Sequence, residues 1–408
     1  MPTLHFNTTR VADLPLHYGH VPPWLAQRMA LLGGAIVESV LQEYGKKAFL
    51  SRMSDPLWFQ ALGCVLGMDW HSSGITTSVM GALKKAINPK SHELGIYICG
   101  GKGRFSKQTP AELLMISQKL GLNGDELIRS SKLTAKVDNT AIQDGFQLYL
   151  HSFVLSSEGE WTVVQQGMNG SNGMARRYHW HSSAIKSYVE DPHTFIYGKN
   201  QGIILNLADK KANASHEAML EITREDPGKM FSEIQKIIMP AHHAVRAKDV
   251  NLKRLGSVLA LAHEKNLRDF ESLLLLEGVG PRTIQSLALV SEVIHGTPIR
   301  FTDPARFSFA HGGKDGHPFP VPTKVYDETI HILQDSVEKA KIGDADKQQA
   351  IKNLGHLAQM LEENFEPDEK LFDTVIERER NESHKFGGRT VFGKAKPPTK
   401  DPDQLELF

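Results

Sequence analysis

The sequence has no excess of charge of either sign. Its 47 lysine and arginine residues are balanced by 47 aspartate and glutamate residues, so the formal net charge at pH 7 is zero. A strongly basic chain would attract nucleic acid through a positive field over the whole molecule. This chain has no such field, so any surface that binds nucleic acid must be a local patch of cations.

Cysteine and long apolar runs are also scarce. The chain has two cysteines, Cys64 and Cys99, in apolar surroundings and without a Cys-x-x-Cys pair. This pattern argues against a disulfide framework and against a structural zinc site, and it is typical of a reducing compartment. No apolar run approaches the ~20 residues that cross a membrane, and the N-terminus has no signal-peptide pattern. We therefore expect a cytoplasmic protein without a membrane partner.

The order of apolar periodicities, glycines and prolines predicts an α+β protein in four parts. Helix-opening prolines such as Pro22 and Pro56 mark the first part, and a near absence of apolar residues marks the last. The expected parts are a helical N-terminal region (1–93), a mixed α/β region (94–213), a helical region (214–366) and a flexible tail (367–408).

Two strands are expected within the mixed region. Residues 146–155 and 161–166 are rich in β-branched, aromatic and leucine residues and are separated by a turn that contains serine and glycine, so they predict a hairpin. Because side chains alternate along a strand, Gln147, Tyr149 and His151 are expected on one face of the first strand.

Polar and titratable side chains gather around this hairpin and predict a metal-dependent active site. Asp138, Asp144 and His151 are the predicted ligands of Mg²⁺ or Mn²⁺, and such an ion can activate a water molecule. Arg176 and Arg177 would contact phosphate and stabilise its developing charge. The predicted catalytic residues are Asp138, Asp144, Gln166, His151, His179 and Arg177.

The same residues also have a structural interpretation. Asp138 and Asp144 can cap turns, and the histidines can be satisfied polar groups in a β-rich interior. The acid-x-lysine pair of the common restriction-type nuclease fold is absent, because Gln165-Gln166-Gly167 ends without a lysine. The sequence leaves both interpretations open.

A turn with two glycines lies between two helical segments of the third part. The segment Gly278-Val-Gly-Pro-Arg-Thr follows a leucine-rich run, and Pro281 suits the first position of a new helix. The glycines allow positive φ and a close approach of backbones, so Val279 can plug between the helices. The N–H groups of Gly280, Arg282 and Thr283 would then point outward and form a phosphate site that reads no base sequence.

This segment resembles the helix-hairpin-helix motif of DNA repair enzymes, nucleases and polymerases. The resemblance implies that the segment holds the DNA backbone, whereas the alternative is an ordinary connection between helices that is capped by glycine. The predicted DNA-binding residues are Gly278, Val279, Gly280, Arg282, Thr283, Arg176 and, in a later glycine-rich loop, Lys314.

Asp303 offers a second possible active site. It lies twenty-five residues after Gly278, close to the spacing at which helix-hairpin-helix DNA glycosylases carry an aspartate. Those glycosylases that also cut the backbone carry a lysine in the second helix, but the cation here is Arg282, which does not deprotonate to attack a substrate. The resemblance therefore leaves a monofunctional glycosylase open, and the alternative is that Asp303 caps a helix through its Asp-Pro pair.

The chain ends on a short apolar segment after some twenty-five residues that cannot build a core. This segment, Gln404-Leu-Glu-Leu-Phe408, resembles the binding motif of the bacterial sliding clamp, Gln-Leu-x-Leu-Phe, at all four defined positions. The resemblance implies docking into a pocket of the clamp. Leu407 and Phe408 would fill that pocket beside Leu405, and Gln404 would hydrogen-bond at its rim. The alternative is a chance pentapeptide.

Several longer segments share a further resemblance. They include Leu14-Pro-Leu-His-Tyr-Gly, Asp69-Trp-His-Ser-Ser-Gly, Gln143-Asp-Gly-Phe-Gln-Leu-Tyr, Ala175-Arg-Arg-Tyr-His-Trp and Ala310-His-Gly-Gly-Lys-Asp-Gly. Through them, most of the chain from Val11 to about Asp327 resembles a bacterial and archaeal family catalogued as domain of unknown function 763. Such a family implies no chemistry, so the activity has to be argued from the residues.

Taken together, these features favour DNA processing in replication or repair. The expected activity is metal-dependent cleavage of phosphodiesters in the mixed region, with the glycine turn holding the DNA backbone and the sliding clamp recruiting the protein to the nucleoid. The alternatives are a glycosylase that uses Asp303 and a non-catalytic DNA-binding adaptor of the clamp. Metal-dependent cleavage of DNA would distinguish the nuclease from these two alternatives.

Overall fold

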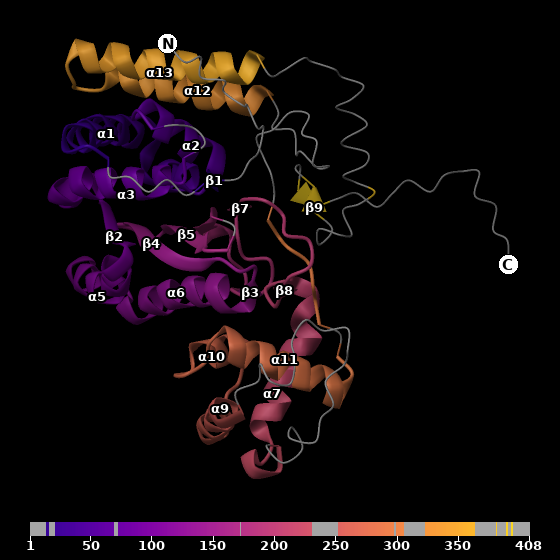
Figure 1. Ribbon diagram of the computed structural model, residues 1–408. Helices are drawn as coiled ribbons and strands as arrows, with labels where there is room; N and C mark the ends of the chain where they lie inside the picture. Colours follow the sequence, from indigo (N-terminus) through magenta and orange to yellow (C-terminus); the bar gives the residue numbers. More distant parts are fainter. Residues whose placement is uncertain are drawn as a thin grey trace.

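The computed structural model describes residues 14–15, 21–68, 72–171, 173–230, 252–297, 299–305 and 323–363, with short pieces at 381, 389–390 and 393–394. The protein is α+β, as predicted, and its sheet lies between two layers of helices (Figure 1). Lys314 and the clamp-like peptide 404–408 lie outside the described residues. No helix among the described residues is long and apolar enough to cross a lipid bilayer.

The central element is a six-stranded antiparallel sheet in the order β1-β6-β5-β4-β2, with β7 paired to the other side of β6 along part of its length. The hairpin predicted from residues 146–155 and 161–166 is confirmed as β4 and β5, whereas β6 was not expected to be a strand. The strands are β1 (Leu14–Pro15), β2 (Ile96–Lys102), β4 (Gln147–Ser156), β5 (Trp161–Asn169), β6 (Met174–His181) and β7 (Phe195–Tyr197).

Side chains alternate between the two faces of the sheet, and helices cover both faces. Val154 and Val164 point into one core, while their neighbours Phe153 and Val163 point into the other. This period of two is the ordinary geometry of a strand, and it explains why β4 and β5 are apolar at successive positions instead of alternate ones. Burial on both faces makes the sheet the centre of the molecule.

The first face is covered by helices of the N-terminal region, and two helices from further along the chain pack against these helices. The helices α12 and α13 pack against α1 and α2, so they lie beside the N-terminal region (Figure 1). The long helix α1 is kinked at Gly45, whose φ of 79° suits glycine. The elements are α1 (Pro23–Met53), α2 (Pro56–Val65), α3 (Gly74–Ile87), η1 (Asn88–Lys90), α4 (Ser91–Leu94), α12 (Thr323–Lys339) and α13 (Asp344–Glu363).

The second face is covered by α5 and α6, below which α7, α9, α10 and α11 form a lobe that shares one hydrophobic core with the sheet (Figure 1). A short second sheet joins this lobe to the centre, because β3 pairs with β8 and Leu205 bridges to Phe301. The elements on this side of the sheet are η2 (Gly103–Gln108), α5 (Thr109–Leu120), α6 (Gly124–Lys136), η3 (Val137–Ala141), β3 (Ile142–Gln143), β8 (Leu205–Asn206), η5 (Lys210–Ala212), α7 (Asn213–Arg224), α9 (Leu252–Lys265), α10 (Phe270–Leu275) and α11 (Pro281–His295). The remaining elements of the described chain are η4 (Ser182–Ala184) and a two-stranded sheet of β9 (Arg389–Thr390) and β10 (Gly393–Lys394).

The helices that the sequence assigned to one region, 214–366, therefore occupy two places. The helices α7, α9, α10 and α11 form the lobe below the sheet, and α12 and α13 join the helices above it (Figure 1). Periodicity along a helix shows which face is buried but not which partner covers it. The sequence alone could not distinguish the two locations.

Candidate nucleic-acid interface and buried polar network

Asp138 lies at the end of α6, in a single π-helical turn, and is fully buried. Its carboxylate accepts hydrogen bonds from Gln165 Nε2 at 2.6 Å, Trp180 Nε1 at 3.0 Å and His193 Nε2 at 2.5 Å. Burial raises the pKa of Asp138, and the neighbouring His193 opposes that shift. Both oxygens are occupied by protein donors, which is the arrangement expected of a buried carboxylate with a structural role.

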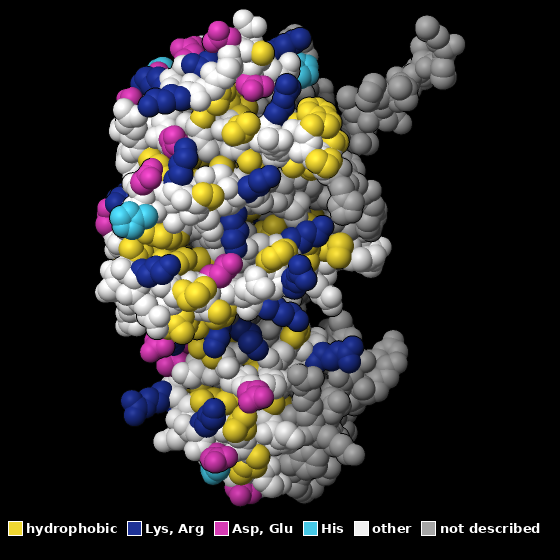
Figure 2. Space-filling view, turned by 90° about the vertical axis from the view of Figure 1, so that its left-hand side faces the viewer, with side chains coloured by type: hydrophobic (Ala, Val, Ile, Leu, Met, Phe, Trp, Pro, Cys, Tyr) yellow, Lys and Arg dark blue, Asp and Glu magenta, His cyan; other side chains and the backbone are white. Residues whose placement is uncertain are grey.

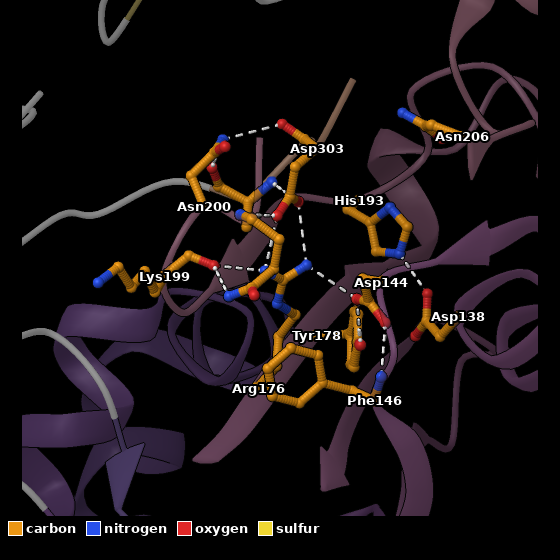
Figure 3. Close-up of polar contacts among 12 residues, drawn as sticks. Asp138, Asp144, Phe146, Arg176, Tyr178, His193, Lys199, Asn200, Asn206 and Asp303 are labelled. Atoms are coloured by element: carbon orange, nitrogen blue, oxygen red, sulfur yellow. Dashed lines mark hydrogen bonds and ion pairs between the residues drawn. The ribbon is translucent and has the colours of Figure 1, made fainter. Parts of the chain in front are cut away.

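Asp144 and Asp303 share one buried arginine (Figure 3). Arg176 Nη1 lies 2.8 Å from Asp144 Oδ2, and Arg176 Nη2 lies 2.7 Å from Asp303 Oδ2. The three side chains are at most 1% exposed. Tyr178 adds a hydrogen bond from its hydroxyl to Asp144, and the guanidinium stacks over the ring of Phe146.

This network ties distant segments together. Arg176 lies on β6, Asp144 precedes β4, and Asp303 follows α11 in a stretch that runs beside residues 202–206. Burial raises the pKa of Asp144, and the Arg176 guanidinium opposes that shift. Arg176 has no exposed atom for a phosphate, and both Asp303 oxygens are bonded to protein donors, so the network presents neither side chain to a ligand at the surface.

Arg177 and His179 point to the opposite face of β6 and are also fully buried. Arg177 donates from Nε to His179 Nε2 and from Nη2 to Gln60, and its guanidinium lies against the rings of Phe59 and Tyr197. Burial lowers the pKa of Arg177 to about 10 and lowers that of His179 well below its ordinary value. Neither side chain has an exposed surface for a substrate.

A β-bulge changes the predicted alternation along β4. The register shifts between Leu148 and Leu150, so Tyr149 is the extra residue. The Tyr149 hydroxyl contacts Gln166, which also donates to the Ser73 carbonyl above the sheet. His151 instead contacts Ser131 of α6 below the sheet. The prediction that Tyr149 and His151 share one face is therefore wrong.

The three predicted metal ligands do not meet at one place. Asp138 is bonded to His193, Asp144 to Arg176, and His151 to Ser131. Within the described part of the chain, no group of three or more histidine, cysteine, aspartate or glutamate side chains could hold a metal ion.

Replacing His151 with glutamine is expected to make the protein less sensitive to acid. Burial lowers the pKa of His151 from 6.5 to about 4, so the folded state keeps the ring neutral while the unfolded chain takes up a proton. The free energy of unfolding therefore decreases as the pH falls from 6.5 towards 4, by up to about 1.4 kcal/mol per pH unit for one such group.

Urea denaturation of both proteins between neutral pH and pH 4.5 checks this prediction, with the difference between their slopes as the readout. Other buried groups, such as His179 and Asp144, titrate in both proteins and cancel in that difference. Equal slopes would show that folding does not lower the pKa of His151. The neutral-pH stability of the variant is measured separately, because the substitution also removes two hydrogen bonds.

The glycine turn has much of the geometry that its sequence predicts. Gly278 has a φ of 81°, Val279 is 4% exposed between the helices, and α11 begins at Pro281. Arg282 is exposed at the start of that helix. Thr283 differs from the prediction, because it is buried and its N–H donates to the Gly280 carbonyl.

Two side chains of the mixed region donate hydrogen bonds to backbone carbonyls of this turn. Lys136 Nζ, at the end of α6, donates to the Val279 carbonyl at 2.5 Å. Gln143 Nε2 donates to the Pro281 carbonyl at 2.7 Å. The turn therefore lies directly beside α6, and the two form a continuous surface.

Cations from β2, η2, α6 and α11 line this surface. We define the basic surface as Lys102, Arg104, Lys107, Lys132, Lys136 and Arg282. Figure 2 shows lysine and arginine side chains gathered on one face, at the height of the sheet, α5 and α6 in Figure 1, with hydrophobic side chains between them. All of these cations except the half-buried Lys136 are exposed, and within the described residues none of the five exposed ones has an acidic partner.

A hollow of about 180 Å³ lies within the basic surface. Lys107 and Lys132 line it together with Tyr149, Ser131 and His151. Lys102 Nζ lies 5.9 Å from the centre of the Tyr149 ring, so the cations of β2 and η2 reach the same place. The hollow connects the cations of η2 with those of α6.

Residues 10–321 match the family described as a protein of unknown function, DUF763. The chain belongs to this family. No curated protein and no solved structure matches the chain. The DUF763 match includes the sheet, the buried network and the whole basic surface, whereas α12 and α13 lie beyond it.

The sequence pointed to only part of the basic surface. Arg282 was predicted as a DNA-binding residue, but Lys102, Arg104, Lys107 and Lys132 were not. Their signal in the sequence is the run Lys102-Gly-Arg-Phe-Ser-Lys107, which places three cations and an aromatic residue within six positions. Such a run is also common on a solvated surface, and its contact with α6 becomes visible only in the fold.

Proposed function

We propose that this protein binds DNA through its phosphate backbone, along the basic surface, and that it acts in replication or repair. The observation that carries the proposal is the row of exposed cations without acidic partners, which ends at the glycine turn beside α6. Lysine and arginine side chains that neutralise phosphates release counterions, and this release supplies most of the affinity of non-specific binding.

An aromatic side chain within the basic surface supports the proposal. Phe105 is 45% exposed between Arg104 and Lys107, and the Arg104 guanidinium lies over its ring. Exposed aromatic rings beside cations can stack on the bases of single-stranded nucleic acid without selecting a sequence. Forked or partly single-stranded DNA therefore fits the surface better than a uniform duplex.

The clamp-like peptide extends the proposal to a partner. A peptide that ends in Leu407-Phe408 has the apolar anchors that fit a pocket on a partner protein. The bacterial sliding clamp would bring the basic surface to DNA at a replication fork or repair site. This recruitment would place the protein at the nucleoid.

The experiment that tests the proposed function measures binding to labelled single-stranded, duplex and forked DNA at several salt concentrations. We expect the affinity to fall steeply between about 50 and 200 mM salt, because phosphate contacts dominate. Binding that is absent at low salt, or that does not respond to salt, contradicts the proposal. The same mixtures with Mg²⁺, Mn²⁺ or EDTA show whether the protein also cleaves DNA, as the sequence predicts.

Deleting residues 404–408 is expected to abolish co-elution with the purified sliding clamp and to leave the affinity for DNA unchanged. The reason is that the basic surface and the peptide share no residue. A full-length variant with the same five residues in scrambled order is the matched control for chain length and composition. Co-elution of either variant with the clamp would remove the clamp from the proposed function.

A further inference from the structure

Four side chains from separate elements form a hydrogen-bonded chain beneath the hollow. Ser131 Oγ lies 2.9 Å from His151 Nε2, and His151 Nδ1 lies 2.8 Å from Gln165 Oε1. Gln165 Nε2 in turn donates to Asp138 Oδ2 at 2.6 Å. The four residues come from α6, β4, β5 and η3, so the fold brings them together and the sequence does not.

The direction of each hydrogen bond follows from the donors available. Trp180 Nε1 can only donate, and it donates to Asp138 Oδ2, which also accepts from the Gln165 amide nitrogen. The Gln165 oxygen therefore faces His151 and accepts from Nδ1–H. The lone pair of His151 Nε2 is left to accept the proton of Ser131.

Ser131 differs from the other hydroxyl residues of α6. Ser130 donates to the Glu126 carbonyl and Thr134 donates to the Ser131 carbonyl, as hydroxyl groups inside helices commonly do. Ser131 instead directs its hydroxyl to His151 across the gap between helix and sheet. A hydroxyl, a neutral imidazole base and an acceptor that orients the base are the three parts of an activated serine nucleophile.

The surroundings of Ser131 select an anionic substrate. Ser131 and His151 line the hollow, whose other lining side chains include the exposed cations Lys107 and Lys132. Positive charge at the rim attracts a substrate that carries negative charge next to the bond to be broken. The hollow lies within the basic surface, so a phosphodiester of bound DNA meets this requirement.

We propose that Ser131 is a nucleophile, activated by His151, that attacks phosphodiesters held on the basic surface. Gln165 and Asp138 are positioning residues that fix the tautomer and orientation of the imidazole. The choice of DNA as substrate rests on the proposed function, whereas the activated serine rests on the hydrogen-bonded chain alone.

The reaction has two balanced steps. Ser131 Oγ forms a bond to phosphorus while its proton passes to His151 Nε2, and the bond from phosphorus to the leaving oxygen breaks as that oxygen takes the proton. Water then attacks the phosphorus of the phosphodiester that links Ser131 to the remaining DNA end and gives a proton to His151; the bond from phosphorus to Ser131 Oγ breaks, and Oγ regains that proton. One water molecule is consumed for each bond cleaved, and Lys107 and Lys132 stabilise the charge on the phosphoryl oxygens.

The test is labelling of the full-length protein with a fluorophosphonate probe, followed by mass spectrometry. We expect one adduct on Ser131 in the wild type and none in Ser131→Ala. The His151→Gln variant should react at least about 100-fold more slowly, because general-base catalysis is lost. The matched control is Ser130→Ala, which removes the neighbouring hydroxyl and should be labelled like the wild type.

Melting temperatures show whether each variant folds. If Ser131→Ala is unfolded, Ser131→Cys keeps the size of the side chain and should also lose the adduct. No adduct in the wild type, or an adduct that persists without Ser131, overturns the proposal. Labelling of Ser131 without hydrolysis of bis(4-nitrophenyl) phosphate in the presence of EDTA overturns the assigned substrate class.

DNA binding by the same preparations separates the two proposals. Salt-dependent binding without labelling contradicts the nucleophile and leaves the proposed function standing. Labelling of Ser131 without any binding to DNA contradicts the proposed function and leaves the activated serine in place.

Discussion

Replacing Arg176 with alanine is expected to lower the free energy of unfolding by about 3–5 kcal/mol or more, because it leaves two buried carboxylates without their cation. Asp144 and Asp303 are each bonded to the Arg176 guanidinium, and the three side chains are at most 1% exposed. Natural domains are stable by only about 5–15 kcal/mol, so the variant is expected to be partly unfolded at moderate temperature. Urea denaturation followed by circular dichroism measures the change.

The matched control is Arg129→Ala, which breaks the ion pair with Glu271. That pair has a comparable distance of 2.8 Å, but its arginine side chain is 41% exposed. Solvent screens such pairs, and their contribution to stability is typically below about 1 kcal/mol. Equal losses in the two variants would show that burial of the Arg176 network does not determine its contribution.

Double replacement tests the same network from the acidic side. Asp303→Asn removes one buried charge and should destabilise the protein less in the Arg176→Ala background than in the wild type, because its cation is already absent. The two residues are in contact, so their effects are expected to be non-additive. Additive losses would indicate that they stabilise the protein independently.

The sequence predicted those elements whose pattern depends on near neighbours. The β4–β5 hairpin follows from two apolar runs and a short turn, and the start of α11 follows from Gly280-Pro281. The α+β class and the buried position of Val279 were also predicted correctly. The hairpin and the start of α11 depend on residues that are close together in the sequence.

The sequence could not show where its polar residues are buried. Arg176 and Arg177 read as a basic cluster, but their partners are Asp303, 127 positions away, and Gln60, 117 positions away. Polar residues on a strand that is covered on both faces give no alternation of apolar and polar positions. For the same reason β6 was not predicted as a strand.

The Ser131–His151 contact was missed on similar grounds. Ser131 is one of two adjacent serines inside a helix, and nothing in the local pattern separates it from Ser130. A bulge at Tyr149 also alters which side chains of β4 face α6. One sequence does not determine a bulge or the partner across a layer.

Removing three cations of the basic surface is the second substitution with a large expected effect. The triple variant Lys102→Ala, Arg104→Ala, Lys107→Ala should weaken DNA binding by roughly 100-fold or more at low salt. The slope of log affinity against log salt concentration should become shallower by about 0.9 for each lost phosphate contact, or about 2.7 in total for a duplex. Fluorescence anisotropy of labelled DNA measures both quantities.

The matched control removes the same amount of charge elsewhere. Lys210, Lys265 and Lys352 are exposed cations on η5, α9 and α13, outside the basic surface. If a diffuse positive field bound the DNA, the two triple variants would lose affinity equally. The formal net charge of zero leaves little room for such a field, so the control should bind nearly as well as the wild type. Binding through contacts at the basic surface therefore predicts unequal losses of affinity in the two triple variants, whereas binding through a diffuse field predicts equal losses.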